Sequence, residues 1–295
     1  MKKNLLYRKS KNRGYRLLLL FHLAIILGKS TLSAQDIQRA DTLNCKYSLL
    51  MSPKQHVIEL FGNTKQIIIS PFQKWDNRKW ITSSLFIGGS LLSYFTLDKP
   101  IHSLLKNEQS QAWRNFNTGF SNIGEPLIIG SFIVGLELMG HISKNNKFNK
   151  VAVLSAHSLF ISLSSCYGAK VLSGRARPTV SDRPDLWYGP TWNDDSKRSF
   201  FSGHTTALFT LTTVIAMEFE HVKWLPPTLY SIAGLSSISR IASDEHWTSD
   251  VVFAALFAHV VARALVNRER NKNKKYSLIP TISPFTSQAG IAILF

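Results

Sequence analysis

The sequence predicts an all-α protein, a membrane-embedded bundle of six helices that follows an N-terminal leader. From residue 80 onward the chain is a series of apolar segments, each suited to a helix of about 18 residues, the length that a bilayer requires. Gly, Ser, Thr and Ala recur inside these segments, which favours close packing between membrane helices. The mean hydropathy of -0.01 is low for an integral membrane protein, so a soluble bundle of buried helices is the alternative.

Residues 1–34 have the pattern of a signal peptide. A basic stretch precedes the apolar run "LLLLFHLAIILG", which is too short to span a bilayer, and "LSA" before Gln35 is similar to a small-residue cleavage site. Leu fits the third position before the cut less well than Ala would. An uncleaved anchor is therefore the alternative interpretation of this leader.

The rest of the chain divides into three parts. Residues 35–79 are mixed in polarity and contain "IIISPFQKW", which predicts an amphipathic or interfacial segment. Residues 80–270 form the predicted helical core, and residues 271–295 form a tail with a strand-like pattern. The expected helices span residues 80–97, 125–142, 151–172, 204–219, 224–241 and 249–266.

The net charge of +17 comes mostly from two short segments, residues 1–16 and residues 263–275. Each lies beside the end of a hydrophobic run, which suits a membrane flank and argues against a nucleic-acid partner. The two cysteines, Cys45 and Cys166, have no metal-ligand spacing and imply no disulfide framework.

Polar residues gather at the ends of the predicted helices. Lys170 and Arg177 are seven residues apart, so a helix ending at Pro178 would carry both cations on one face. Ser202 and Gly203 begin the fourth helix, where free N–H groups and partial positive charge can cradle anionic oxygens.

The segment "SRIASDEHWTSD" adds an oriented histidine and a third cation. His246 and Asp250 are four residues apart, so on a helix the carboxylate can hold one ring nitrogen and leave the other aimed outward. Arg240 can bind phosphate oxygens through two parallel hydrogen bonds. Alternate helix ends meet on one side of an up-and-down bundle, so these residues can converge there with His204. A surface hydrogen bond or part of a metal site is the alternative interpretation of the His–Asp pair.

Three stretches, "KVLSGRARP", "FSGH" and "SRIASDEHWTSD", resemble the signature motifs of the type 2 phosphatidic acid phosphatase (PAP2) family, which shares its site with vanadium haloperoxidases and class A acid phosphatases. The resemblance covers roughly residues 80–266, and three motifs in order are more specific than any single motif. One departure is Phe201, where the family usually has Pro. This change keeps a backbone N–H and removes no side chain that touches phosphate.

The resemblance implies a role for each matching residue and implies the six-helix PAP2/haloperoxidase type of bundle. His246 would attack phosphorus and form a phospho-histidine, and Asp250 would orient it. His204 would protonate the leaving oxygen and later activate water. The equatorial oxygens would be bound by three cations and by amides near two helix-start residues, namely Lys170, Arg177, Arg240, Ser202 and Gly203. No metal and no cofactor is expected.

The other basic residues of the same loop, Arg175, Arg183, Lys197 and Arg198, are expected to be solvated charges outside the site. The expected function is a phosphatase that acts on a phosphorylated lipid, a phosphate or pyrophosphate monoester, at a membrane. A vanadium-dependent haloperoxidase, a soluble periplasmic acid phosphatase of the same superfamily, and a non-catalytic protein that binds anionic lipid heads are the alternatives.

Basic loops favour an inner-membrane protein whose site faces the periplasm, with a periplasmic location as the alternative. A cleaved leader followed by six spans would instead place the site in the cytoplasm.

Overall fold

The computed structural model describes residues 48–49, 52–69, 77–106, 110–275, 278–282 and 289–293. The expected leader, residues 1–34, lies outside the described residues, as does part of the expected interfacial segment. In chain order, the elements are α3 (Pro53–Ile69), α4 (Asn77–Thr96), α5 (Asp98–Lys106), α6 (Gln111–Ser121), α7 (Pro126–Ile142), α8 (Asn146–Ser173), the short helix η2 (Asp195–Lys197), α9 (Gly203–Glu218), α10 (Leu225–Ala242), α11 (Thr248–Lys275), β1 (Leu278–Ile282) and β2 (Ala289–Ile293).

The all-α class is confirmed, and each of the six apolar segments is helical, as α4 and α7 to α11. Three helices were not expected separately, namely α3, α5 and α6. The helices α5 and α6 have 9 and 11 residues, at or below the shortest window in which an apolar repeat is recognisable. In the tail, β1 and β2 pair as an antiparallel hairpin in which Pro280 lies opposite Ile291.

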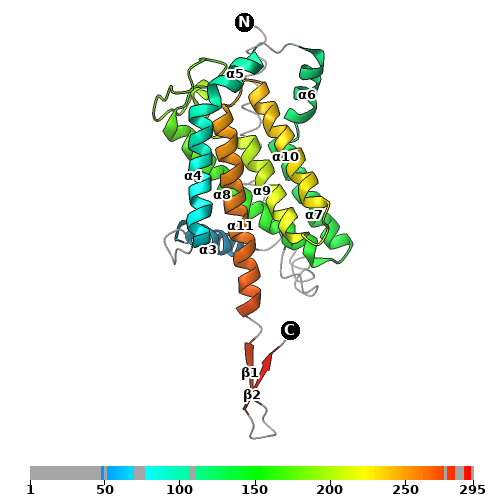
Figure 1. Cartoon of the computed structure of the whole chain (residues 1–295). Helices are drawn as coiled ribbons and strands as arrows, with labels where there is room; N and C mark the ends of the chain where they lie inside the picture. Colours follow the sequence, from blue (N-terminus) through cyan, green and yellow to red (C-terminus); the bar gives the residue numbers. More distant parts are fainter. Residues whose placement is uncertain are drawn as a thin grey trace.

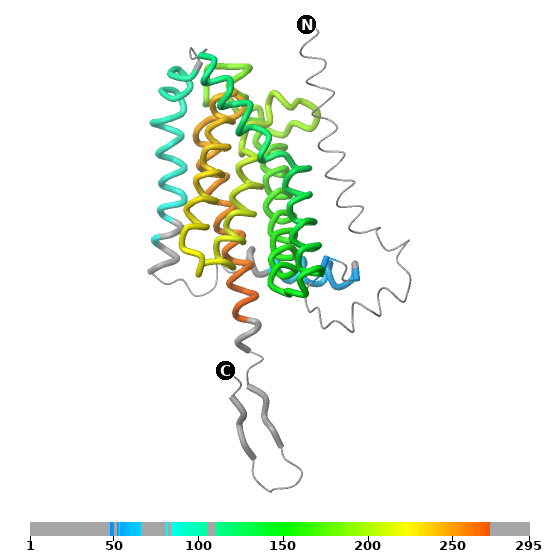
Figure 2. Tube along the Cα trace, turned by 90° about the vertical axis from the view of Figure 1, so that its right-hand side faces the viewer, coloured from blue at the N-terminus to red at the C-terminus, as the bar shows by residue number. Residues whose placement is uncertain are grey.

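The bundle helices run alternately up and down, so the sequence-distant motifs meet at one end (Figure 1). The ends of α4, α8 and α10 and the starts of α9 and α11 lie at this end, and Figure 2 shows the same alternation from the side. α9 packs against α8, α10 and α11. The core between them includes the fully buried Val151, Val214 and Val266.

The other end of the bundle is covered by α3, which lies across its base (Figure 1). His56 of α3 lies 3.0 Å from His157 of α8, measured between Nδ1 and Nε2. Arg268 of α11 donates a hydrogen bond to Asn63 of α3. A buried polar contact on each side therefore fixes α3 to the two long helices.

Two described helices are long and apolar enough to cross a membrane, Asn146–Ser173 and Thr248–Asn271. A third span is possible if Gln111–Ser121 and Pro126–Ile142, which are bent by 47° at their junction, are taken together. Large apolar side chains such as Leu92, Phe95 and Leu127 are exposed on α4 and α7, which suits contact with lipid more than with water. The chain is a membrane protein.

The end of α8 differs from the sequence-based expectation. The helix ends at Ser173 because Gly174 adopts the left-handed conformation, with φ of 60°, and caps it. A Cβ atom at Gly174 would lie 2.0 Å from the carbonyl oxygen of Gly189, so no other residue fits there without a shift. Arg177 therefore lies in the loop after α8, and the predicted helix that would end at Pro178 is wrong.

Candidate active site

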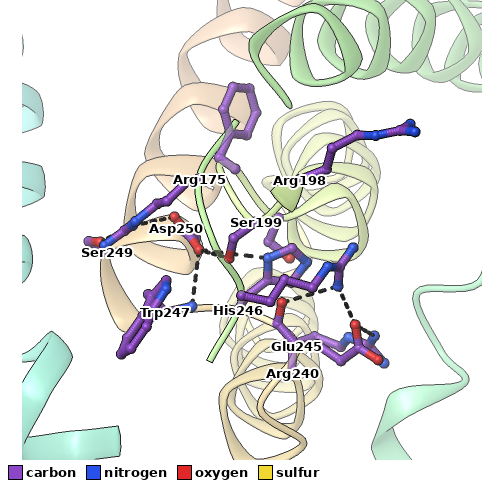
Figure 3. Close-up of polar contacts among 12 residues, drawn as sticks. Arg175, Arg198, Ser199, Arg240, Glu245, His246, Trp247, Ser249 and Asp250 are labelled. Carbon is purple, nitrogen blue, oxygen red and sulfur yellow. Dashed lines mark hydrogen bonds and ion pairs between the residues drawn. The ribbon is translucent and has the colours of Figure 1, made fainter. Parts of the chain in front are cut away.

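The candidate residues come from four segments that meet at the end of the bundle where α8 and α10 finish. Lys170 is in the last turn of α8, and Arg177 lies in the loop that follows. Arg240 is in the last turn of α10, and His246 lies just before α11. Figure 3 shows His246, Asp250 and Arg240 side by side with residues that were not predicted.

Asp250 is the most completely bonded member of the group, and its side chain is fully buried. One oxygen, Oδ1, accepts a hydrogen bond from Arg175 Nη1 at 2.5 Å. The other, Oδ2, accepts from Ser199 Oγ at 2.5 Å and from the backbone N–H of Trp247 at 3.0 Å. These donors come from the loop between α8 and α9 and from the loop before α11, so they fix the carboxylate in one orientation.

His246 faces this carboxylate but does not form the predicted hydrogen bond. Its Nδ1 atom lies 3.8 Å from Asp250 Oδ2, within ion-pair distance but beyond hydrogen-bonding distance. Nδ1 is buried and has no hydrogen-bond partner among the described residues. A movement of about 1 Å would create the bond.

The electrostatic surroundings of His246 keep the ring neutral. Burial lowers its pKa well below the usual value of 6.5, and the positive charges of Lys170 and Arg177 lower it further, against the opposing effect of Asp250. A neutral imidazole has a free lone pair, as a nucleophile requires.

The three predicted cations have different partners in this structure. Lys170 Nζ donates to the backbone oxygens of Arg198 and Ser199, at 2.7 and 3.2 Å. Arg177 donates to the carbonyl oxygen of Asp195 at 2.8 Å and to the side chain of Glu245.

Among the three predicted cations, Arg240 has the most N–H donors without a close acceptor among the described residues. Its Nη2 atom lies 3.8 Å from Glu245 Oε2, and its buried Nε has no partner among the described residues.

Glu245 was not predicted, although it directly precedes His246. Its buried carboxylate lies between the guanidinium groups of Arg177 and Arg240, as Figure 3 shows for Arg240. An anion bound by these two arginines would therefore compete with a carboxylate that is part of the protein.

The start of α9 has the predicted helix cap, with one difference. The Ser202 hydroxyl accepts a hydrogen bond from Thr205 N at 3.4 Å and so acts as the N-cap. The backbone N–H of Ser202 donates to the carbonyl oxygen of Asp250 at 3.3 Å, so this amide is not free for a ligand. The amides of Gly203 and His204 have no acceptor within the helix, as in any first turn. A Cβ atom at Gly203 would meet only Cys166 Sγ, at 4.0 Å, so no close approach requires glycine there.

His204 is paired with a residue that lies 79 positions earlier in the chain. Its Nε2 atom lies 3.2 Å from Glu125 Oε1, at the start of α7. Burial lowers the pKa of His204, whereas Glu125 raises it. The backbone beside this glutamate is close to the ring, because a Cβ atom at Gly124 would lie 3.0 Å from Cδ2 of His204.

Arg175 corrects the sequence-based expectation that it is a solvated charge. Its side chain is 1% exposed and bridges the carboxylates of Asp98 and Asp250. Burial alone would lower its pKa, and the two carboxylates raise it above its usual value. By contrast, Arg183 and Lys197 pair with acidic neighbours at partly exposed positions, as solvated charges do.

Phe201, the departure from the usual motif, is buried and packs at a tilt against the rings of Phe253 and Phe257. Within the described part of the chain, no group of three or more His, Cys, Asp or Glu side chains could hold a metal ion.

Residues 151–274 match the family model of the PAP2 superfamily. That range contains all three motifs and every predicted site residue, so the similarity to this superfamily includes the whole candidate site. A curated relative, the lipid A 1-phosphatase of Porphyromonas gingivalis, is 25% identical over 172 residues, which are 57% of this chain and 34% of the relative. The chain thus spans about a third of the length of that relative.

Two solved structures are similar to parts of this chain. LpxE of Aquifex aeolicus is 19% identical with a TM-score of 0.45, and the match covers 58% of this chain and 96% of that one. The transmembrane PAP2 type phosphatidylglycerolphosphate phosphatase of Bacillus subtilis is 17% identical with a TM-score of 0.48, over 70% of this chain and 98% of that one.

Proposed function

We propose that the protein is a membrane phosphatase that hydrolyses phosphate or pyrophosphate monoesters of lipids without a metal, through a phospho-histidine at His246. One observation carries the proposal. His246 faces the fully buried carboxylate of Asp250 at 3.8 Å, and burial together with the charges of Lys170 and Arg177 lowers the pKa of its ring. The pKa of the second histidine, His204, is lowered by burial and raised by Glu125. A neutral nucleophile, a second imidazole and anion-binding cations are the components that phosphoryl transfer needs.

In the first step, His246 Nε2, the nitrogen that does not face Asp250, attacks phosphorus. A P–N bond forms while the bond from phosphorus to the leaving oxygen breaks, and protonated His204 gives its proton to that oxygen. The imidazole becomes positively charged, and the Asp250 carboxylate stabilises the proton on Nδ1.

In the second step, His204 takes a proton from water and the hydroxide attacks phosphorus. The P–N bond breaks, phosphate leaves, and His246 returns to its neutral form. Both steps place developing charge on the equatorial oxygens, where Lys170, Arg177 and Arg240 and the first amides of α9 would stabilise it.

We further propose that the protein lies in the inner membrane with this site facing the periplasm. Lys144 and Lys223 lie in the connections at the end of the bundle opposite the site, Lys147 lies in the first turn of α8 at the same end, and the basic end of α11 lies there too. Basic connections favour the cytoplasmic side. This orientation puts α3 in the cytoplasm, which requires either that residues 1–34 are retained or that the chain crosses the membrane before α3.

The substrate is proposed as a lipid phosphate, because the site lies at the end of a membrane bundle. The name of the Porphyromonas gingivalis relative makes the 1-phosphate of lipid A the first candidate to test. Phosphatidate, phosphatidylglycerol phosphate and undecaprenyl pyrophosphate present similar head groups.

The test is phosphate release from these four lipids by the purified chain in detergent, with and without EDTA. We expect release from at least one lipid, unchanged by EDTA. Release from none of them, or activity lost in EDTA and restored by Mg²⁺ or Zn²⁺, would contradict the proposal. Peroxide-dependent bromination with vanadate that is faster than phosphate hydrolysis would favour the haloperoxidase.

A further inference from the structure

A short helix, α5, lies outside the segment that matches the superfamily, and its first residue contacts residues that hold the candidate site. α5 begins at Asp98, more than 50 residues before the segment that matches the superfamily, residues 151–274. The Asp98 side chain is fully buried. Oδ1 accepts from Ser249 N at 2.7 Å, and Oδ2 accepts from Ser249 Oγ and from Arg175 Nη2, both at 2.7 Å. All three partners donate to Asp98, whose two oxygens both act as acceptors, as a carboxylate allows. An amide in the same place would turn an NH2 group towards at least one donor.

The same two partners continue to the candidate site. Arg175 Nη1 donates to Asp250 at 2.5 Å and to Ser249 Oγ at 2.8 Å, while its Nε donates to Pro184 O at 3.1 Å. Because the guanidinium is planar, the bond to Asp98 at one end sets the direction of Nη1 at the other. Ser249 is the residue before Asp250, so the bond to its N–H also fixes the first turn of α11.

Aromatic rings close the space around this guanidinium. The carbon at the centre of the Arg175 guanidinium lies 5.1, 4.9 and 5.7 Å from the ring centres of Tyr94, Trp187 and Trp247, respectively. Cation–π contacts stabilise the charge, and the rings restrict other orientations of the side chain. The arginine is thus held by one carboxylate on each side and by a ring cage.

We propose that Asp98 is a positioning residue that acts through Arg175 and Ser249 to orient the Asp250 carboxylate towards His246. This inference rests on the proposed function, since its consequence is a change in reaction rate. Without Asp98, the buried guanidinium and the N–H of Ser249 each lose an acceptor. Arg175 could then turn fully towards Asp250 and compete with His246 for the carboxylate.

The geometry separates this effect from phosphate binding. Asp98 bonds to Arg175 and Ser249, whereas Lys170 bonds to the loop carbonyls of Arg198 and Ser199. Loss of Asp98 should therefore slow the attack by His246 and leave the affinity for an inert phosphate analogue unchanged.

The main experiment compares Asp98→Asn with Asp185→Asn, an acidic residue on the exposed loop. For the full chain in detergent, kcat with an aryl phosphate, the inhibition constant of sulfate and the unfolding temperature are measured. Sulfate is chosen because it is tetrahedral and forms no bond to the nucleophile. We expect Asp98→Asn to lower kcat by about 100-fold, the order expected for a misplaced reacting group, with unchanged sulfate inhibition. Asp185→Asn should change neither value.

Two further variants separate positioning from a loss of folding. Ser249→Ala keeps the ion pair between Asp98 and Arg175 and removes one hydroxyl, so it should fold and lower kcat less. In an Asp250→Asn background, Asp98→Asn should have little further effect, because both changes act on one interaction.

Unchanged kcat in Asp98→Asn would overturn the inference. So would fully additive effects with Asp250→Asn, or a weakening of sulfate inhibition in step with a lower unfolding temperature. In each of these cases, if the wild-type protein is active, the proposed function still holds and only the role of Asp98 is overturned. A wild-type protein inactive on every phosphate ester would overturn the proposed function and this inference together.

Discussion

The Nδ1 atom of His246 lies 3.8 Å from the Oδ2 atom of Asp250, although the carboxylate is held by three other donors. The carboxylate is therefore placed before the histidine becomes charged. Attack on phosphorus creates a positive imidazole, and this charge would draw Nδ1 into hydrogen-bond range. The two residues thus contribute differently, because His246 forms the bond to phosphorus and Asp250 stabilises the product of that attack.

His246→Ala should abolish phosphate release, because the covalent route needs the imidazole. Asp250→Asn should retain the nucleophile and lose about 10²- to 10⁴-fold in kcat, the range seen when a histidine loses its orienting carboxylate. Steady-state phosphate release measures both effects, and trapping of a labelled phosphoenzyme by acid-free quenching tests for the covalent intermediate. Normal activity of His246→Ala would disprove the phospho-histidine route.

Glu125→Gln should shift the pH dependence of the reaction. His204 acts as an acid only when protonated, and burial lowers its pKa while Glu125 raises it. Removing the carboxylate should lower this pKa further, so kcat/KM for a lipid substrate should begin to fall at a lower pH than in the wild type. An aryl phosphate, which needs little protonation of its leaving group, should show no such shift.

The control for this prediction is Glu220→Gln, an exposed glutamate at the far end of α9. It should leave both pH profiles unchanged. If kcat/KM for the lipid substrate fell at the same alkaline pH in Glu125→Gln as in the wild type, either His204 would not be the acid or Glu125 would not raise its pKa.

How far the site could be predicted depends on the sequence separation of its parts. The approach of His246 to Asp250 and the cap at Ser202 are local in sequence and so were predictable, although His246 precedes α11 and lies too far from the carboxylate for the predicted hydrogen bond. Asp98 and Glu125 reach the site from 151 and 79 residues away in the chain, and no periodic pattern marks such contacts. Both were missed for this reason.

Arg175 and Arg177 show that contacts can also be missed for residues that are close together in the chain. They are two residues apart in one basic loop, and the motif resemblance selected Arg177 without revealing that Arg175 is buried. The fold separates them, because Gly174 ends α8 early and the loop that follows turns Arg175 towards α5 and Arg177 towards Glu245. Helix existence was predictable for the six apolar segments, whereas this helix end depended on a contact with Gly189.

Gly174→Ala should destabilise the protein more than Gly189→Ala. Both glycines have positive φ, 60° and 77°, so each alanine costs about 1–2 kcal/mol in backbone energy. At Gly174 the new Cβ would also meet the Gly189 carbonyl at 2.0 Å, whereas nothing lies within 4 Å of a Cβ at Gly189. Thermal unfolding of both variants in detergent compares them directly, and equal unfolding temperatures would refute the cap geometry.

Glu245→Gln should strengthen inhibition by phosphate and vanadate. The carboxylate lies between Arg177 and Arg240, so an incoming anion must compete with it. Removing this charge should lower the inhibition constant by about tenfold, equivalent to one charged hydrogen bond of about 1.5 kcal/mol. Asp195→Asn is the matched comparison, because Asp195 contacts Arg177 from the more exposed side. Weaker inhibition in Glu245→Gln would mean that Glu245 orients the arginines and does not compete for them.

The orientation of the bundle can be tested with reporters at its two ends. The connection between α7 and α8 and the end of α11 lie at the end opposite the site, so an outward-facing site puts both in the cytoplasm. Fusions after Lys147 and after Lys275 should therefore report a cytoplasmic location, and a reporter inserted near Asp185 should report the periplasm. The two long apolar helices predict that carbonate extraction leaves the protein in the membrane fraction. An external signal at Lys147 and Lys275 would reverse the orientation, and release by carbonate would refute embedding in the membrane.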